Sequence, residues 1–195
     1  MSLHRLATVL LIAAVTVLVA LLALADAVAA GPGDVERGAV ERGAYLVRAM
    51  ACNDCHTPWK VGPRGPEPDM SRMLSGHPSD LVMPAAPALP PGPWLVVSSG
   101  TNTAWAGPWG VSFTANLTPD PETGLGKWTE QNFADAMRSG RHMGRGRPIL
   151  PPMPDPAVGG LTDADLHAVW AYLRSIPAIK NRVPDPVAPA AAPGH

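Results

Sequence analysis

The chain of 195 residues is long enough for one domain with an appended segment. Its formal net charge of −1 at pH 7 gives no strong field towards nucleic acid or an anionic membrane, so no nucleic-acid partner is expected. The 24 prolines and 19 glycines are residue types unfavourable inside helices, and they predict a loop-rich body.

The N-terminal segment is apolar. After Arg5, residues 6–25 carry no charge, and this run is long enough to span a bilayer and long for the core of a cleaved signal peptide. The small residues Ala27 and Ala29 also offer a cleavage site. Residues 1–30 are therefore interpreted as a membrane anchor, or as a signal peptide cleaved near residue 30. Either form places the body on the periplasmic side of the bacterial inner membrane, because the positive charge precedes the apolar run.

The first predicted helix of the body runs from about Glu36 to Met50, after a short linker at residues 31–36. Gly43 lies inside this helix and costs about 1 kcal/mol relative to alanine. We therefore expect another helix to cross closely at Gly43. The apolar residues of the predicted helix are Val40, Ala44, Tyr45, Leu46 and Val47.

Both cysteines of the chain lie in the stretch "CNDCH", as Cys52 and Cys55. Four interpretations compete: a disulfide, a redox-active dithiol, half of a zinc site and a covalent haem c site. A disulfide closing so small a ring would stabilise the fold little, since its entropic gain grows with loop length. A redox dithiol is expected in a βαβ context, whereas the residues before Cys52 have a helical pattern.

A zinc site needs about four ligands, usually as two cysteine or histidine pairs, and the sequence has no second pair. The other histidines are scattered singly, as His4, His77, His142, His167 and His195. The haem interpretation uses the whole stretch, because each thiol can form a thioether with a haem vinyl group and His56 can bind iron from the proximal side. The sequence therefore favours one covalent haem c, held by Cys52, Cys55 and His56, and export agrees because haem c is attached outside the cytoplasm.

Residues 57–112 are predicted to be mostly loop, with one short turn in "SRMLSGHP". Prolines interrupt this stretch too often for long helices or central strands. A structureless segment of this length is unusual inside a compact domain, so we expect it to lie against the edge of the haem.

Two further helices are predicted. In "KWTEQNFADAMRSG", Thr129 is a plausible N-cap and Gly140 a plausible stop. In "LTDADLHAVWAYLRSIP", Thr162 caps a helix that Pro177 ends. The apolar residues of this last helix are Leu166, Val169, Trp170 and Leu173. The proline-rich tail, residues 183–195, is expected to be extended or disordered.

A low-spin electron carrier needs a second axial ligand, usually methionine or histidine. The candidates are His142, Met143, Met153 and His167. Met153 is favoured because it lies between Pro152 and Pro154, and prolines fix the backbone and lower the entropy cost of holding a thioether on iron. Met137, on the apolar face of a helix, is interpreted as a core residue.

An arginine-rich loop connects the middle helix to Met153. Its arginines are Arg138, Arg141, Arg145 and Arg147. Two roles stay open for them: contact with the haem propionates, and docking of an acidic redox partner.

The order of these features resembles a class I c-type cytochrome: helix, "CNDCH", loops, helix, proline-flanked methionine and a last helix with aromatic residues. The chain is most similar to the cytochrome c domains and subunits of bacterial membrane dehydrogenases, through "ANLTPDPETGLGKW", "PPMP" and "DLHAVWAYLRSIP". The match covers about residues 37–180. Many proteins of this kind carry two or three haems, whereas this chain has one CxxCH motif.

The resemblance implies an all-α cytochrome c-like domain around one haem at residues 37–182. It also implies that Cys52 and Cys55 are the thioether anchors, His56 the proximal ligand and Met153 the distal ligand. The first and last helices are expected to cross near Gly43, against residues such as Trp170 and Leu173.

The expected function is one-electron transfer by an electron carrier rather than an enzyme, in association with the membrane. Its partners are redox proteins: a dehydrogenase, an oxidase or another cytochrome. Two alternatives stay open: a peroxidase-like haem c enzyme, which needs an open iron site, and a gas sensor with a displaceable distal ligand.

Overall fold

A computed structural model describes residues 12–19, 32–87, 89 and 92–189, and the chain divides into one unit of residues 1–38 and another of residues 39–195. Residues 12–19 are helical. Within the described ranges, no helix combines the length and the apolar character needed to cross a membrane. The predicted apolar span at residues 6–25 and the possible cleavage site at Ala27 and Ala29 fall mostly or wholly outside those ranges.

Helix α2 extends over Pro32–Ala49 and therefore begins inside the segment expected to be a linker. Asp34 lies in its first turn and Arg48 in its last, and both charges suit the helix dipole. The helix ends where predicted. Ala51 adopts the left-handed conformation, with φ 57°, and turns the chain into the next helix.

Helix α6, Asp163–Ser175, crosses α2 at Gly43. A Cβ atom at Gly43 would lie 2.7 Å from the Cβ atom of Tyr172 and would meet the backbone carbonyl of Ala168. The close crossing predicted from this glycine is confirmed. An ion pair of 2.9 Å between Arg42 and Asp165 connects the same two helices.

Helix α4, Glu130–Ser139, begins and ends as its sequence predicted. The Thr129 hydroxyl accepts a hydrogen bond from the Asn132 backbone at 3.1 Å, and the Asn132 side chain accepts one from the Thr129 backbone at 3.2 Å. Gly140 ends the helix in the left-handed region, with φ 63°. These bonds satisfy two of the free N–H groups at the helix start.

Helix α6 likewise follows its predicted caps, since the Thr162 hydroxyl accepts from the Asp165 backbone at 3.1 Å. Its inward face joins α2 and α4 in one core. The buried members of this core include Leu46, Val47, Leu74, Leu125, Phe133, Leu166, Val169 and Leu173.

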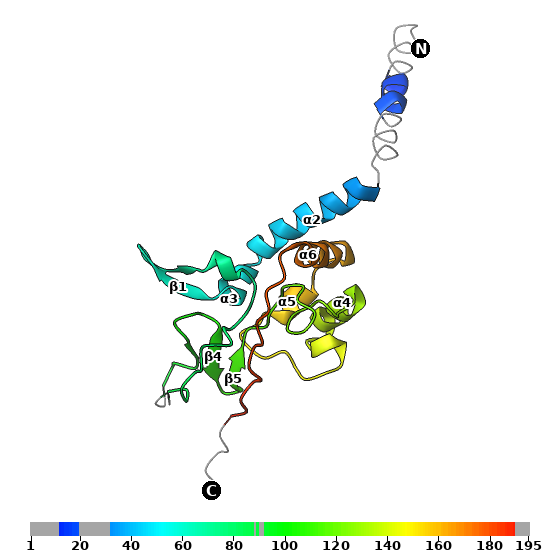
Figure 1. Cartoon of the computed structure of the whole chain (residues 1–195). Helices are drawn as coiled ribbons and strands as arrows, with labels where there is room; N and C mark the ends of the chain where they lie inside the picture. The colour runs from blue at the N-terminus through cyan, green and yellow to red at the C-terminus, as the bar shows by residue number, and fades with distance from the viewer. Residues whose placement is uncertain (1–11, 20–31, 88, 90–91, 190–195) are drawn as a thin grey trace. The chain divides into compact units, whose positions relative to one another are not determined.

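The all-α prediction was wrong in part, because the long loop contains two small antiparallel sheets (Figure 1). One pairs β1, Trp59–Gly62, with β2, Gly65–Pro68. The second sheet has the strand order β3–β4–β5. Its strands are β3, Val97–Ser98, β4, Ala104–Gly107, and β5, Gly110–Phe113. The loop also contains a 3₁₀ turn, η1, at Met70–Arg72.

The position of the prolines explains why these strands were missed. Pro63 and Pro108 occupy the two-residue connections of the hairpins, between the pairs Gly62–Gly65 and Gly107–Gly110. Proline interrupts a strand but is compatible with a turn. Two of the prolines that argued against strands therefore mark where the strands reverse, whereas Pro66 and Pro68 lie within β2, which pairs on one side with β1.

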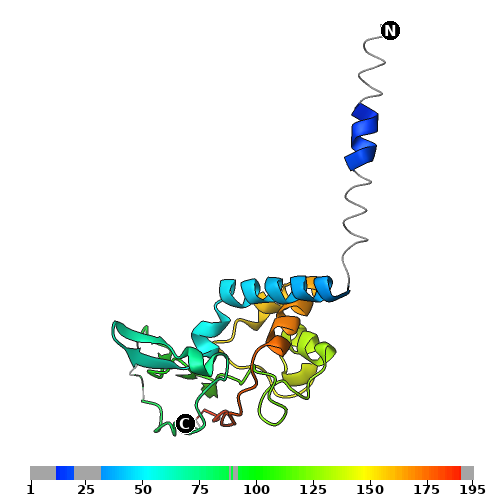
Figure 2. The ribbon, with the colours of Figure 1, turned by 45° about the horizontal axis from the view of Figure 1, so that its top comes forward.

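The chain after α6 runs back past the three-stranded sheet (Figures 1 and 2). Val187 makes two backbone hydrogen bonds with Val111 of β5, at 2.8 and 2.9 Å. The tail was predicted to be extended or disordered, and it is extended at Val187. Residues 190–195 lie outside the described ranges.

Candidate haem site

The CxxCH stretch forms one helical turn, α3, over Cys52–His56. The backbone N–H of Thr57 donates to the carbonyl of Asn53 at 3.0 Å, and the Thr57 hydroxyl donates to the Asn53 side chain at 3.0 Å. This turn places Cys52 and Cys55 three residues apart on neighbouring positions of the helix surface. Both are free and half-buried.

The two thiols have raised pKa values. Burial is the main cause in each case, and it raises the pKa of Cys52 to about 11 and shifts the pKa of Cys55 in the same direction. A redox-active dithiol usually has a lowered thiol pKa in an electropositive environment. The surroundings of Cys52 and Cys55 therefore do not have the character of a redox dithiol.

His56 is 9% exposed, and its Nδ1 atom lies 2.8 Å from the carbonyl oxygen of Ala115. Because a carbonyl only accepts, Nδ1 carries the proton and Nε2 keeps its lone pair. Burial lowers the pKa of His56, although the bond to Ala115 acts in the opposite direction. A neutral, oriented imidazole is the form that binds metals.

A loop behind His56 also holds its backbone. The N–H of Gly76 donates to the His56 carbonyl at 2.8 Å. Gly76 has φ 77°, and a Cβ atom there would lie 2.7 Å from the Ala115 oxygen. Only glycine satisfies both the positive φ and this close approach. Sequence reasoning missed Ala115, because a backbone carbonyl leaves no side-chain signal, and it missed Gly76 because glycines are frequent in this chain.

Met153 is half-buried and packs, like Cys52, against the central core. The Ser112 hydroxyl donates to the carbonyl of Pro151 at 2.6 Å and so connects the loop of Met153 to β5. A short helix, α5, follows at Asp155–Gly159. The partly buried apolar residues around the same core include Met50, Met73, Leu117, Trp128, Met137, Leu161 and Trp170.

The other candidates for the second axial ligand have different neighbours. Met143 is in a 3₁₀ turn, η2, over His142–Gly144, and has φ 52°. The ring of His142 contacts Trp128, with centroids 4.9 Å apart. The Nδ1 atom of His167 lies 2.9 Å from a carboxylate oxygen of Glu130. Met137 packs on the core from α4, as predicted for a core methionine.

The arginines before Met153 are at the surface or nearly so. Arg138 pairs with Asp163 at 2.6 Å, and Arg141 donates to the carbonyl of Gly146 at 2.8 Å. Arg147 donates to the Pro148 carbonyl at 3.3 Å. Their roles in propionate contact or partner docking stay predictions.

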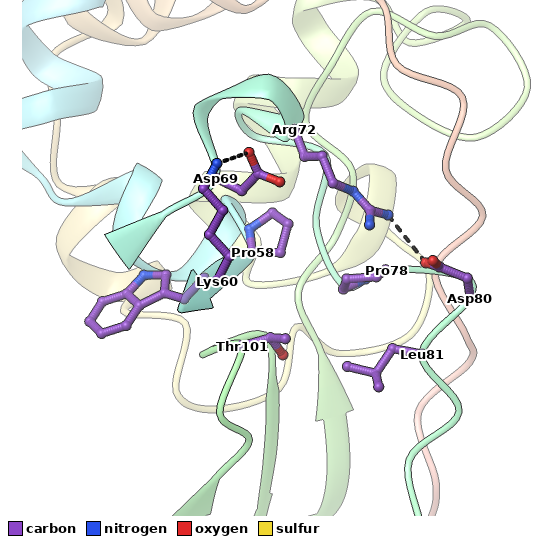
Figure 3. A pocket seen from close by; sticks show the side chains of 9 residues that line it. Pro58, Lys60, Asp69, Arg72, Pro78, Asp80, Leu81 and Thr101 are labelled. Atoms are coloured by element: carbon purple, nitrogen blue, oxygen red, sulfur yellow. Dashed lines mark hydrogen bonds and ion pairs between the residues drawn. The ribbon is translucent and has the colours of Figure 1, made fainter. Parts of the chain in front are cut away.

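A cavity of about 280 Å³ opens next to α3 (Figure 3). Two ion pairs cross its wall: Lys60 with Asp69 at 3.1 Å, and Arg72 with Asp80 at 3.4 Å. Its other lining residues are Pro58, Trp59, Pro78, Leu81 and Thr101. None of the predicted haem-binding residues lines it, so it is distinct from the candidate site.

The donor set fits a haem c. Two free thiols share one helical turn, and the following imidazole is neutral, buried and oriented by a carbonyl. No group of three or more His, Cys, Asp or Glu side chains suited to a metal ion occurs among the residues that the structure describes.

The chain is similar to cytochrome subunits of bacterial dehydrogenases. No family model matches the chain. The cytochrome c subunit of alcohol dehydrogenase (quinone) from Gluconobacter oxydans is 28% identical over 160 residues, which is 80% of this chain and 26% of that protein. The cytochrome subunit of fructose dehydrogenase from Gluconobacter japonicus is 27% identical over 161 residues, again 80% of this chain and 26% of the relative.

A third relative, the cytochrome c subunit of gluconate 2-dehydrogenase from Pantoea cypripedii, is 28% identical over 133 residues, which is 68% of this chain and 22% of that protein. The chain spans about a quarter of the length of these cytochrome subunits. Its homologues over most of its length are thus cytochrome c subunits of bacterial dehydrogenases, at modest identity. The resemblance predicted from the sequence is confirmed.

Proposed function

We propose that this chain is a monohaem c-type cytochrome that passes one electron at a time between redox proteins on the periplasmic side of the bacterial inner membrane. The observation that carries the proposal is the α3 turn, in which two free thiols precede a histidine oriented by the Ala115 carbonyl. A bound haem would supply an iron that alternates between the ferric and ferrous states.

Each residue of the site has a defined role in the proposal. The thiols of Cys52 and Cys55 would hold the haem through two thioethers, each thiol adding across a vinyl group with its proton passing to the neighbouring carbon. His56 would bind the iron through Nε2, while Nδ1 donates to the Ala115 carbonyl. The thioether sulfur of Met153 would be the second protein ligand of the iron, and the hydrogen bond from Ser112 to Pro151 steadies its loop.

The proposed partner is a dehydrogenase, as the names of the relatives suggest, an oxidase or another cytochrome. Because the chain has a single CxxCH motif, it provides one relay. Residues 1–30 are proposed to direct export, either as an uncleaved anchor or as a cleaved signal peptide. N-terminal sequencing of the exported protein and a carbonate wash of membranes distinguish these two forms.

The test is a spectroscopic redox titration of the exported full chain. We expect one covalent haem per chain, a titration with one electron, and a charge-transfer band from methionine bound to ferric iron. Absence of covalent haem would refute the proposal. A ferrous wild-type protein that binds carbon monoxide would show an open iron and would favour a peroxidase-like enzyme or a gas sensor instead.

A further inference from the structure

The segment after α6 makes an extensive set of polar contacts through Asn181, which is 3% exposed. Its side-chain N–H₂ group donates to the carbonyls of Ser75 and His77, at 2.7 and 2.8 Å. Its side-chain oxygen accepts from the Ser79 backbone at 2.9 Å. A primary amide has the two donors and the acceptor that these three groups require.

Residues Ser75 and His77 flank Gly76, and Gly76 contacts the proposed proximal ligand. Its N–H donates to the carbonyl of His56 at 2.8 Å. It also packs against the Ala115 carbonyl, which binds Nδ1 of the same histidine. Displacement of this loop would therefore change two contacts of His56 together.

The same segment supports the second contact of His56 by a separate route. Asn116, directly after Ala115, donates through its side chain to the carbonyl of Ile179 at 2.8 Å. Asn116 is 4% exposed, and its side-chain oxygen accepts from the Thr118 backbone at 3.0 Å. The chain after α6 therefore supports both contacts of His56: the loop of Gly76 through Asn181, and the segment of Ala115 through Asn116.

We propose that Asn181 is a positioning residue for His56, and that it sets the reduction potential through the strength of the hydrogen bond from His56 to Ala115. This inference rests on the proposed haem ligation by His56. A strong Nδ1–H bond to a carbonyl increases the electron density that an imidazole gives to iron and favours the ferric state. Loosening the loop weakens that bond, and the potential rises.

The test compares Asn181→Ala with Thr162→Ala in the haem-loaded full chain. The Thr162 hydroxyl accepts from the Asp165 backbone at the start of α6, at 3.1 Å, and loss of such a cap lowers the folded-to-unfolded ratio about fivefold, which is about 1 kcal/mol. This bond involves neither the loop of Gly76 nor the segment of Ala115. We expect both variants to lose stability. Asn181→Ala alone should also raise the reduction potential, by up to about 59 mV, which is a factor of about ten in the one-electron equilibrium.

A second readout is the nuclear magnetic resonance signal of the His56 Nδ1 proton in the ferrous protein. In Asn181→Ala this signal should shift and exchange faster with water, because its acceptor is less well held; in Thr162→Ala it should stay unchanged. Should Asn181→Ala fail to accumulate, Asn181→Ser is measured instead, since its hydroxyl can still serve one carbonyl, and a smaller change in the same direction is expected.

Several results would overturn the assignment. An unchanged potential and an unchanged proton signal in the Asn181 variant, with covalent haem intact, would refute the positioning role alone. An equal shift in Thr162→Ala would show general loosening of the fold, which also refutes it. Loss of covalent haem from the wild-type chain would instead refute the proposed function, and the positioning role with it.

Discussion

The two sides of the candidate haem site are built differently. On the side proposed to be proximal, His56 is held by the Ala115 carbonyl and by the backbone N–H of Gly76, and the loop of Gly76 is held in turn by the buried side chain of Asn181. On the side proposed to be distal, Met153 is half-buried in an otherwise exposed loop, which the side chain of Ser112 connects to the sheet. The difference indicates that the proposed proximal ligand is held more rigidly than the proposed distal one.

The largest effect is expected at the proximal turn. Changing both Cys52 and Cys55 to alanine should abolish covalent haem, since these are the two cysteines of the chain and no thiol remains to form a thioether. Each single change should lower the haem content. The measurement is haem staining after denaturing electrophoresis. Retention of haem by the double variant would show that attachment does not use these cysteines.

The second effect concerns the distal ligand itself. Met153→His should keep the iron six-coordinate but lower the potential by roughly 100 mV or more, because a thioether stabilises ferrous iron better than an imidazole. Met153→Ala should open the site to carbon monoxide. Met143→Ala is the matched control and should do neither. The opposite pattern would assign the ligand to Met143.

A smaller effect is expected from the tie between the distal loop and the sheet. Ser112→Ala removes the donor to Pro151 and should cost about 1 kcal/mol. Loss of the methionine–ferric iron band on heating should therefore occur at a lower temperature. The control is Ser98→Ala, at an exposed position of β3. Equal behaviour of the two variants would mean that Ser112 does not hold the loop.

The smallest effect is a pH dependence of the free energy of unfolding, which arises from His77, the residue after Gly76. Burial lowers the pKa of His77, which bonds Thr103 and Leu81 in its neutral form. The unfolded chain therefore binds this proton at a higher pH than the folded chain. The contribution of neutral His77 to the free energy of unfolding is fully present above about pH 6.5, the pKa of histidine in an unfolded chain. It falls as the pH drops towards the lower pKa of His77 in the folded chain.

Urea unfolding at about pH 7.5 and about pH 5 measures this dependence. The free energy of unfolding should fall less between these two values in His77→Gln than in the wild type, although His77→Gln is the less stable protein at neutral pH. A wild type and a variant with identical pH dependence would show that His77 does not titrate on unfolding in this range.

The sequence predicted the helices better than the long loop, for physical reasons. Thr129 and Thr162 cap α4 and α6 through local bonds that a sequence pattern reveals. Gly43 revealed the helix crossing, because a glycine inside a helix is otherwise unfavourable. The strands were missed because prolines such as Pro63 have opposite meanings inside a strand and in a hairpin turn.

In the candidate site too, local sequence patterns predicted some residues and missed their long-range contacts. Local spacing predicted Cys52, Cys55 and His56, and flanking prolines predicted Met153. The partner of His56 is a carbonyl 59 residues further along the chain, and Asn181 contacts Ser75 over 106 residues. Such contacts depend on how the loops pack in three dimensions, and no local pattern encodes them.

The pairing of Val187 with Val111 covers part of a sheet edge. An uncovered sheet edge is a template on which another chain can add a strand and begin to aggregate. Val187 occupies the outer edge of β5 at this point. Removal of the chain end before this residue would uncover that edge, so we expect the trimmed protein to self-associate more readily than the full chain.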